Sequence, residues 1–209
     1  MLKDWLTDGQ RRALDACRRV RQPFAEPAIA TPAIALFEWE TLARLLAADP
    51  SPDTLVVRRA ELLDHALPRS LDDVRALFGM GAGLVVRRAE RHDEGLRDLA
   101  SRFEAEHGGR AHAQLFVTPE GMHGFGWHYD AEDVFILQTV GEKSYYFRAN
   151  TQSPRLGPGE RPDFGAIARE TSPTATTTLR AGDALYLPRG TWHVARARTD
   201  SFHISLGLS

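Results

Sequence analysis

From Ala111 onward the chain consists of short segments of alternating apolar and polar residues, separated by glycine, proline and other turn residues. Successive side chains of an extended strand face opposite sides, so this alternation is typical of strands with one buried face. The segments expected to be strands are 112–117, 126–130, 134–140, 144–148, 175–179, 184–187, 192–198 and 202–208. They predict a mainly β fold with flanking helices, in which the strands form a jelly-roll barrel, or double-stranded β-helix.

Residues 1–109 mix helix and strand patterns. Helices are expected where apolar residues recur at helical spacing or where a charged run has helix-like composition, and short apolar runs are expected to be strands. The expected helices are 1–20, 37–48, 71–78 and 93–107, and the expected strands are 55–57 and 84–86. A length of 209 residues suits one domain. We therefore expect an N-terminal α+β portion, 1–109, packed on a double-stranded β-helix core formed by 110–209.

Charge and cysteine content narrow the function classes. The chain has 26 basic and 28 acidic residues, a net charge of −2, which does not favour nucleic-acid binding. Cys17 is the only cysteine, so the 209 residues can form neither an internal disulfide nor a cysteine-based zinc cluster. No apolar stretch has the length of a membrane span, and the N-terminus lacks the apolar core of a signal peptide. We expect a cytoplasmic protein without membrane contact.

The segments 126–130 and 192–198 carry a candidate metal site. His128 and Asp130 are two positions apart in an expected strand, so their side chains share one face while Tyr129 faces the other. His193 follows a tight proline and glycine turn near the end of the chain. Two histidines and one carboxylate form the facial triad that binds non-haem Fe(II) and leaves coordination positions open. The alternative is a chance His-x-Asp pair, since the chain has eight histidines.

Three motifs resemble the Jumonji C hydroxylases, cupin-like Fe(II)- and 2-oxoglutarate-dependent oxygenases, and most of all their ribosomal oxygenase branch. The first runs from His128 to Gln138 and continues to Gly141-Glu142-Lys143, the second is 182–193, and the third is 201–206. They occur in the family's order within about residues 80–209. The resemblance implies the double-stranded β-helix, Fe(II), and 2-oxoglutarate and dioxygen as co-substrates.

The resemblance also implies roles for single residues. His128, Asp130 and His193 correspond to the metal ligands, and so to the catalytic centre. Lys143 stands where the family binds the distal carboxylate of 2-oxoglutarate, and Ser205 where a small hydroxyl residue supports the same carboxylate. Without the resemblance, Lys143 would be read as a solvated turn residue beside Glu142.

Further residues are expected around the co-substrate and the substrate. Gln114 lies on a strand that presents polar groups to the co-substrate in relatives, whereas Phe116 stands where relatives often have a tyrosine and so lacks its hydroxyl donor. Trp127 departs from the proline or threonine common before the first ligand. His203 shares strand parity with Ser205, and His123 lies in a glycine loop. Both are expected to contact substrate or metal ligands, with a core histidine and an exposed loop residue as the alternatives.

The resemblance implies hydroxylation of a C–H bond in a protein or peptide side chain, histidine or arginine among them. The 209 residues have no counterpart of the branch's C-terminal helical dimerisation and winged-helix regions. A free amino acid or another small molecule is therefore a competing substrate, and a homodimer is one expected assembly. Two other classes stay open: a non-catalytic cupin module that binds a metal or ligand, and a metal-dependent cupin that does not use 2-oxoglutarate.

The segment 150–164 carries Pro154, Pro158 and Pro162 and separates two of the expected strands. Its composition predicts a surface loop at the mouth or rim of the barrel.

Overall fold

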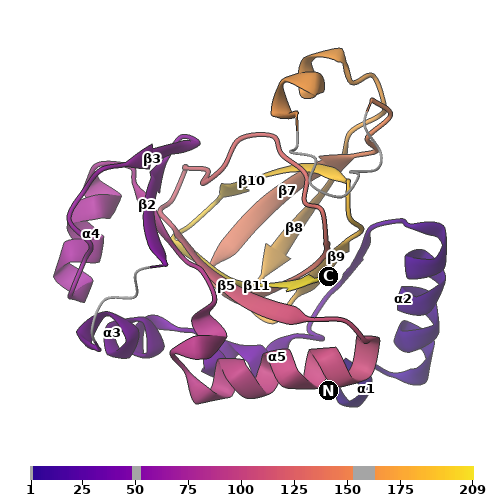
Figure 1. The fold of residues 1–209 in the computed structure, drawn as a ribbon, viewed down its shortest axis with the longest axis horizontal. Helices are drawn as coiled ribbons and strands as arrows, with labels where there is room; N and C mark the ends of the chain where they lie inside the picture. The colour runs from indigo at the N-terminus through magenta and orange to yellow at the C-terminus, as the bar shows by residue number, and fades with distance from the viewer. Residues whose placement is uncertain (1, 49–52, 153–162) are drawn as a thin grey trace.

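A computed structural model describes residues 2–48, 53–152 and 163–209 of the chain (Figure 1). Its centre consists of two antiparallel sheets that face each other. The large sheet has the strand order β1-β9-β6-β11-β5-β4-β2-β3, and the small sheet has the order β10-β7-β8. The strands are β1 (Phe24–Glu26), β2 (Thr54–Arg58), β3 (Glu61–Leu63), β4 (Gly83–Val86), β5 (Ala111–Thr118), β6 (Asp133–Val140), β7 (Glu142–Arg148), β8 (Ala175–Arg180), β9 (Ala184–Leu187), β10 (Trp192–Ala197) and β11 (Ser201–Leu208).

The helices lie mostly in the N-terminal part, near their expected positions. The α-helices are α1 (Leu2–Trp5), α2 (Asp8–Val20), α3 (Trp39–Ala47), α4 (Leu71–Gly79) and α5 (Glu94–His107), and the 3-10 helices are η1 (Thr31–Leu36), η2 (Ala89–Arg91) and η3 (Phe164–Arg169). Thr7 and Ser70 begin α2 and α4 with capping boxes, which satisfy backbone N–H groups that have no partner inside the helix. Within the described ranges, no helix is both long and apolar enough to cross a membrane.

The N-terminal part shares the large sheet with the C-terminal part. β4 pairs with β5, and β2 pairs with β4 and β3, so these strands extend the sheet at one side. β1 pairs with β9 at the other side. Residues 1–109 therefore supply both edges of a sheet whose centre comes from residues 110–209, while the division between the two portions stays a prediction.

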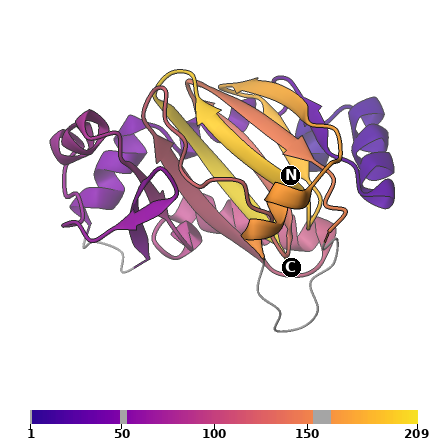
Figure 2. The same cartoon turned by 90° about the horizontal axis from the view of Figure 1, so that it is seen from above.

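Strand alternation divides the large sheet into two chemically different faces. The outer face is apolar and packs against the helices, as Figure 2 shows from above. Phe103 of α5 meets Phe135 of β6 edge to face at 5.1 Å between ring centroids, and Phe37 stacks on Phe202 of β11 at 5.2 Å. Burial of this face holds the helices on the sheet. The inner face, turned toward the small sheet, is therefore free to carry polar side chains.

The structure confirms the mainly β jelly-roll class and seven of the eight strands expected after Ala111. The expected strand at 126–130 is wrong: the segment makes a single bridge, from His128 to His193, and otherwise runs as irregular chain. The carbonyl of Gly126, two positions before His128, lies against Nδ1 of that histidine instead of joining a ladder with β10. Among the described residues, the two sheets face each other without closing into one hydrogen-bonded ring. Most of the predicted rim loop, residues 153–162, lies outside the described residues.

Candidate metal centre

The His128–His193 bridge brings together two residues far apart in the sequence. The backbone N–H of His128 donates to the carbonyl of His193 at 3.1 Å, and the N–H of His193 donates back to the carbonyl of His128 at 2.8 Å. The two rings lie side by side with centroids 4.2 Å apart. One bridged residue pair is therefore enough to fix both imidazoles in the same place.

Backbone hydrogen bonds also set the orientation of both rings. Nδ1 of His128 is 2.8 Å from the carbonyl oxygen of Gly126, and Nδ1 of His193 is 3.0 Å from that of Thr191. A carbonyl oxygen can only accept, so Nδ1 carries the proton in each neutral ring. Nε2 of each ring then has a free lone pair, which is the form that binds a metal ion.

Asp130 completes the group. Its Oδ2 lies 3.5 Å from Nε2 of His193, and one candidate ligand atom from each of His128, Asp130 and His193 lies within 4.8 Å of the others. Gly190 donates its N–H to the carbonyl of Asp130 at 2.8 Å, so the turn before β10 holds the backbone of this residue. Burial, and then the neighbouring His128, lower the pKa of His193 to about 4, which keeps that ring neutral at pH 7.

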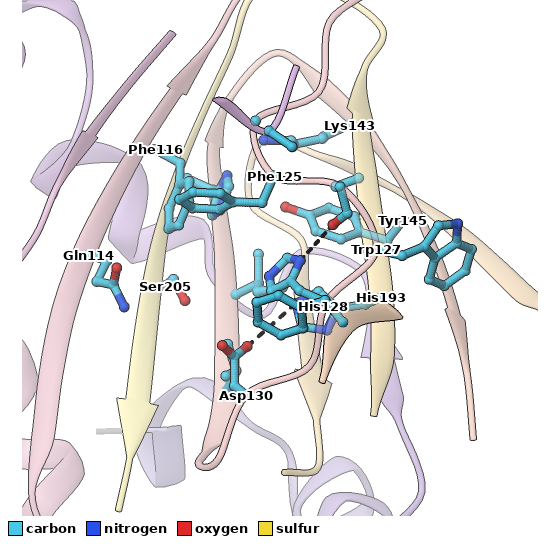
Figure 3. Close-up of a pocket in the computed structure, with 18 of the residues that line it drawn as sticks. Gln114, Phe116, Phe125, Trp127, His128, Asp130, Lys143, Tyr145, His193 and Ser205 are labelled. Carbon is cyan, nitrogen blue, oxygen red and sulfur yellow. Dashed lines mark hydrogen bonds and ion pairs between the residues drawn. The ribbon is translucent and has the colours of Figure 1, made fainter. Parts of the chain in front are cut away.

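These three residues line one cavity between the two sheets. Its volume is about 440 Å³, and Figure 3 shows the ligand group beside Lys143 and Tyr145. Most of the wall comes from strands of the inner faces and from the loop that precedes β6. The lining residues are Ala60, Gln114, Phe116, Gly124, Phe125, Gly126, Trp127, His128, Asp130, Glu132, Val134, Ile136, Lys143, Tyr145, Phe164, His193, Ala195, His203 and Ser205.

Lys143 places a buried amine in this cavity. Its side chain enters from β7, its Nζ lies 2.9 Å from the hydroxyl of Thr118, and 6.0 Å separates Nζ from the ring centroid of Phe116. Among the described residues no carboxylate forms an ion pair with Lys143, which is 2% exposed. Burial therefore lowers the pKa of Lys143 to about 7. The alternative reading of Lys143 as a solvated turn residue does not fit this burial.

Two more polar groups point into the same region without a hydrogen-bond partner in the described part of the chain. They are the hydroxyl of Tyr145 and Nδ1 of His203. His203 stacks on Phe116 with 4.6 Å between ring centroids, and its pKa lies well below the usual value because it is buried and faces Lys143. Burial also raises the pKa of Tyr145, so its hydroxyl stays protonated. The region offers three hydrogen-bond donors or acceptors to a polar ligand.

The remaining expected site residues differ in whether they line the cavity. Gln114, Ser205, Trp127 and His203 line the cavity, whereas His123 does not. Tyr145 and Thr118 were missed by the sequence reasoning. Strand parity could have found Tyr145, since it stands two positions after Lys143 on β7. Thr118 had no local signal, because its contact with Lys143 depends on how the two sheets face each other.

A family model described as the JmjC domain matches residues 88–209 of the chain. The chain belongs to the JmjC domain family. The expected resemblance is thus confirmed over more than half of the sequence. Similar JmjC proteins include the bifunctional lysine-specific demethylase and histidyl-hydroxylase NO66 of Dictyostelium discoideum, 38% identical over 96 residues, which are 45% of this chain and 19% of that protein. Ribosomal oxygenase 2 of Bos taurus is 32% identical over 114 residues, 54% of this chain and 24% of its own length.

Solved structures show the same fold. The X-ray structure of Escherichia coli ycfD aligns with 98% of this chain and 53% of its own, at a TM-score of 0.68 and 19% identity. The ribosomal oxygenase YcfD in complex with cobalt and 2-oxoglutarate aligns with 90% of this chain and 48% of its own, at a TM-score of 0.64 and 21% identity. This JmjC chain spans about a fifth to a quarter of these two curated relatives and about half of these structures.

Proposed function

We propose that the protein is an Fe(II)- and 2-oxoglutarate-dependent dioxygenase that hydroxylates a C–H bond of a protein or peptide side chain. The observation that carries the proposal is one cavity that holds both a two-histidine, one-carboxylate group and an uncompensated buried lysine. Two histidines and one carboxylate are the ligand set of a non-haem iron. The buried lysine can bind the carboxylate of a co-substrate.

The donor set fits Fe(II). Both imidazoles present an unprotonated Nε2, and the carboxylate of Asp130 supplies an oxygen on the same side. Three protein ligands leave positions open toward the cavity, as an iron that binds a co-substrate and dioxygen requires. We therefore assign His128, Asp130 and His193 as the ligands.

The polar region around Lys143 fits the distal carboxylate of 2-oxoglutarate. A buried amine without a counter-charge is costly, and an incoming carboxylate offsets that cost with a charge-assisted hydrogen bond. The hydroxyls of Tyr145 and Thr118 and Nδ1 of His203 lie in the same region, and the ring of Phe116, on which His203 stacks, forms an apolar side. Gln114 and Ser205 line the cavity wall and contribute further polar contacts to the bound molecules.

When bound, Fe(II) and 2-oxoglutarate supply the oxidising chemistry: dioxygen is reduced as 2-oxoglutarate is converted to succinate and carbon dioxide, and one oxygen atom enters the substrate C–H bond. The chain's own residues hold and orient these groups. Contacts with backbone carbonyls hold the rings of His128 and His193 so that both Nε2 atoms face the metal position. Lys143 orients the co-substrate by binding its distal carboxylate. The aromatic residues Phe125, Trp127 and Phe164 also line the cavity, and their apolar rings help to exclude water from it.

The names of the relatives support a protein substrate, since they include a histidyl-hydroxylase and ribosomal oxygenases. A histidine or arginine side chain of a protein is the substrate class that we infer, and a free amino acid or other small molecule is the competitor. A reducing cytoplasm suits the proposal because it keeps iron ferrous. A homodimer stays a prediction that light scattering of the purified protein would test.

An anaerobic titration with Fe(II) and 2-oxoglutarate tests the proposal directly. The co-substrate bound to iron through its 2-oxo acid group should produce a weak visible charge-transfer band, and admission of oxygen should then release succinate. A non-catalytic module would produce no succinate, and a cupin that does not use 2-oxoglutarate would produce no band.

Variants that lack one proposed metal ligand test whether the charge-transfer band and the succinate arise at this site. His128→Ala or Asp130→Ala should abolish the band and the succinate, because either change removes a ligand. His65→Ala is the matched control, since His65 is exposed and lies outside the cavity. Retention of the band in both ligand variants would contradict the assignment.

A further inference from the structure

The turn of the β2–β3 hairpin forms part of the cavity wall. Arg58 pairs with Glu61, so Arg59 and Ala60 make a two-residue turn, and Ala60 lines the cavity. The backbone N–H of Ala60 donates to the carbonyl of Gly124 at 2.8 Å. This bond joins the hairpin turn to the loop that precedes His128, and Figure 1 shows the two segments side by side.

Neither residue of this turn is glycine, and the backbone of both is strained. Arg59 has φ 49° and Ala60 has φ 69°, the left-handed region that asparagine and glycine usually occupy in such turns. A left-handed conformation costs roughly 1–2 kcal/mol for an ordinary residue. Backbone strain of this kind is retained where the surrounding structure needs it, most often at functional sites. Arg59, which is not part of the cavity lining, lies on the other side of the turn.

A groove of about 580 Å³ lies on that other side. Arg58, Arg59 and Glu61 line it from the hairpin, and Met80 and Met122 line it from the neighbouring segments. Met122 lines the groove, whereas Gly124 of the same loop lines the cavity. The hydrogen bond between Ala60 and Gly124 therefore lies at the boundary between the groove and the cavity. The groove is therefore adjacent to the cavity, and a peptide with one side chain beside Ala60 would cross only this turn to reach it.

Charge and side-chain chemistry define the occupant. Arg58 and Arg59 are exposed, and no ion pair of either guanidinium is found within the described ranges. Among the described residues that line the groove, Glu61 is the one acidic residue, so the two arginines leave the groove with an excess positive charge. Met80 is 45% exposed and provides a flexible apolar floor. An acidic side chain on an extended peptide satisfies both features.

We propose that this groove binds an acidic residue of a peptide substrate a few positions from the residue whose side chain enters the cavity. The inference rests on the proposed function, and it assigns substrate selection to the N-terminal hairpin. Arg58 and Arg59 are specificity-determining residues that contact the flanking part of the substrate, away from the reacting atoms.

A selection from short random peptides displayed on phage tests the inference, with the protein held anaerobically in Fe(II) and 2-oxoglutarate so that bound peptides are not consumed. Wild-type protein should enrich aspartate or glutamate at one position. The double variant Arg58→Glu/Arg59→Glu should lose that enrichment or select lysine and arginine instead. The matched control, Arg97→Glu/Arg102→Glu, makes the same charge change on exposed positions of α5 and should select as wild type does.

Fluorescence anisotropy then measures the affinity for an enriched peptide and for the same peptide with its glutamate replaced by lysine. Wild type should bind the acidic peptide about tenfold more tightly, the size expected for two exposed ion pairs, and the hairpin variant should reverse the order. Absence of acidic enrichment, enrichment of basic peptides, or the same preference in the hairpin variant would overturn the inference. The charge-transfer band, recorded on the same samples without peptide, reports separately on the proposed function and on the folding of each variant.

Discussion

At the scale of single residues, the candidate site depends on hydrogen bonds that leave other atoms free. Carbonyl groups of Gly126 and Thr191 hold Nδ1 of the two histidines, so that both Nε2 atoms face the same point. Lys143 is the opposite case, because burial leaves its amine with one hydroxyl contact and, in the part of the chain that the structure describes, no counter-charge. The two Nε2 atoms therefore favour a bound metal ion, and the amine favours a bound carboxylate, over the empty cavity.

Replacement of Lys143 by methionine tests its role with little change in volume. Lys143→Met should weaken 2-oxoglutarate binding about tenfold to a hundredfold, the value of one charge-assisted hydrogen bond. The charge-transfer titration measures the dissociation constant. Ser144→Ala is the neighbouring control, because the Ser144 hydroxyl bonds Thr178 on β8 and is not part of the cavity wall. An unchanged affinity in Lys143→Met would remove the residue from the co-substrate site.

The pKa of Lys143 predicts a pH dependence. Its value of about 7 in the empty cavity should rise when a carboxylate binds, because the carboxylate favours the charged amine. Below pH 7 the amine is already protonated, whereas above pH 7 binding requires proton uptake. The dissociation constant for 2-oxoglutarate should therefore increase by up to about tenfold per pH unit above 7. Titrations across this range check the slope, and Lys143→Met should show none; an equal slope in that variant would assign it to another group.

At the scale of elements, turns between strands set the register that brings the site residues together. The β6–β7 turn contains Gly141 at φ 69°, directly before the strand that carries Lys143. Glu142 donates its N–H to the hydroxyl of Thr199 at 2.9 Å, which ties this turn to the segment between β10 and β11. The site therefore depends on close approach of two turns.

A methyl group at Gly141 should break that approach. The added Cβ would clash with the backbone oxygen of Asp200, in a conformation that already disfavours alanine. Gly141→Ala should lower the free energy of unfolding by roughly 2–4 kcal/mol, which urea denaturation measures. Gly79→Ala is the control, because nothing lies within 4 Å of a Cβ there. Equal stability of the two variants would show that the turns can separate without cost.

At the scale of the whole molecule, the helices cover one face of the large sheet and leave the other face to the cavity (Figures 1 and 2). The ligands come from an irregular loop and from the small sheet, and the hairpin closes one side. Since the metal site exists only when these parts are assembled, metal binding and folding are linked.

Metal and co-substrate should therefore stabilise the entire fold. At a hundredfold excess over the dissociation constant, a ligand that binds only the folded state adds about 2.7 kcal/mol to the free energy of unfolding. Anaerobic urea denaturation with Fe(II) and 2-oxoglutarate should show this gain, and EDTA should remove it. His128→Ala should show no gain. A gain of the same size in that variant would place the metal elsewhere.

The sequence alone predicted most of the strands and the mainly β class, because alternation is a property of neighbouring residues, and its resemblance to the family indicated the residues that the structure brings together as a candidate ligand group. Tertiary structure decided the rest. It reduced 126–130 to one bridge, kept His123 out of the cavity, and added Tyr145, Thr118 and the hairpin turn at Ala60 to the site. Apart from Tyr145, which shares strand parity with Lys143, these outcomes depend on how two sheets face each other and on pairing between distant segments, and no local pattern of residues encodes such long-range contacts.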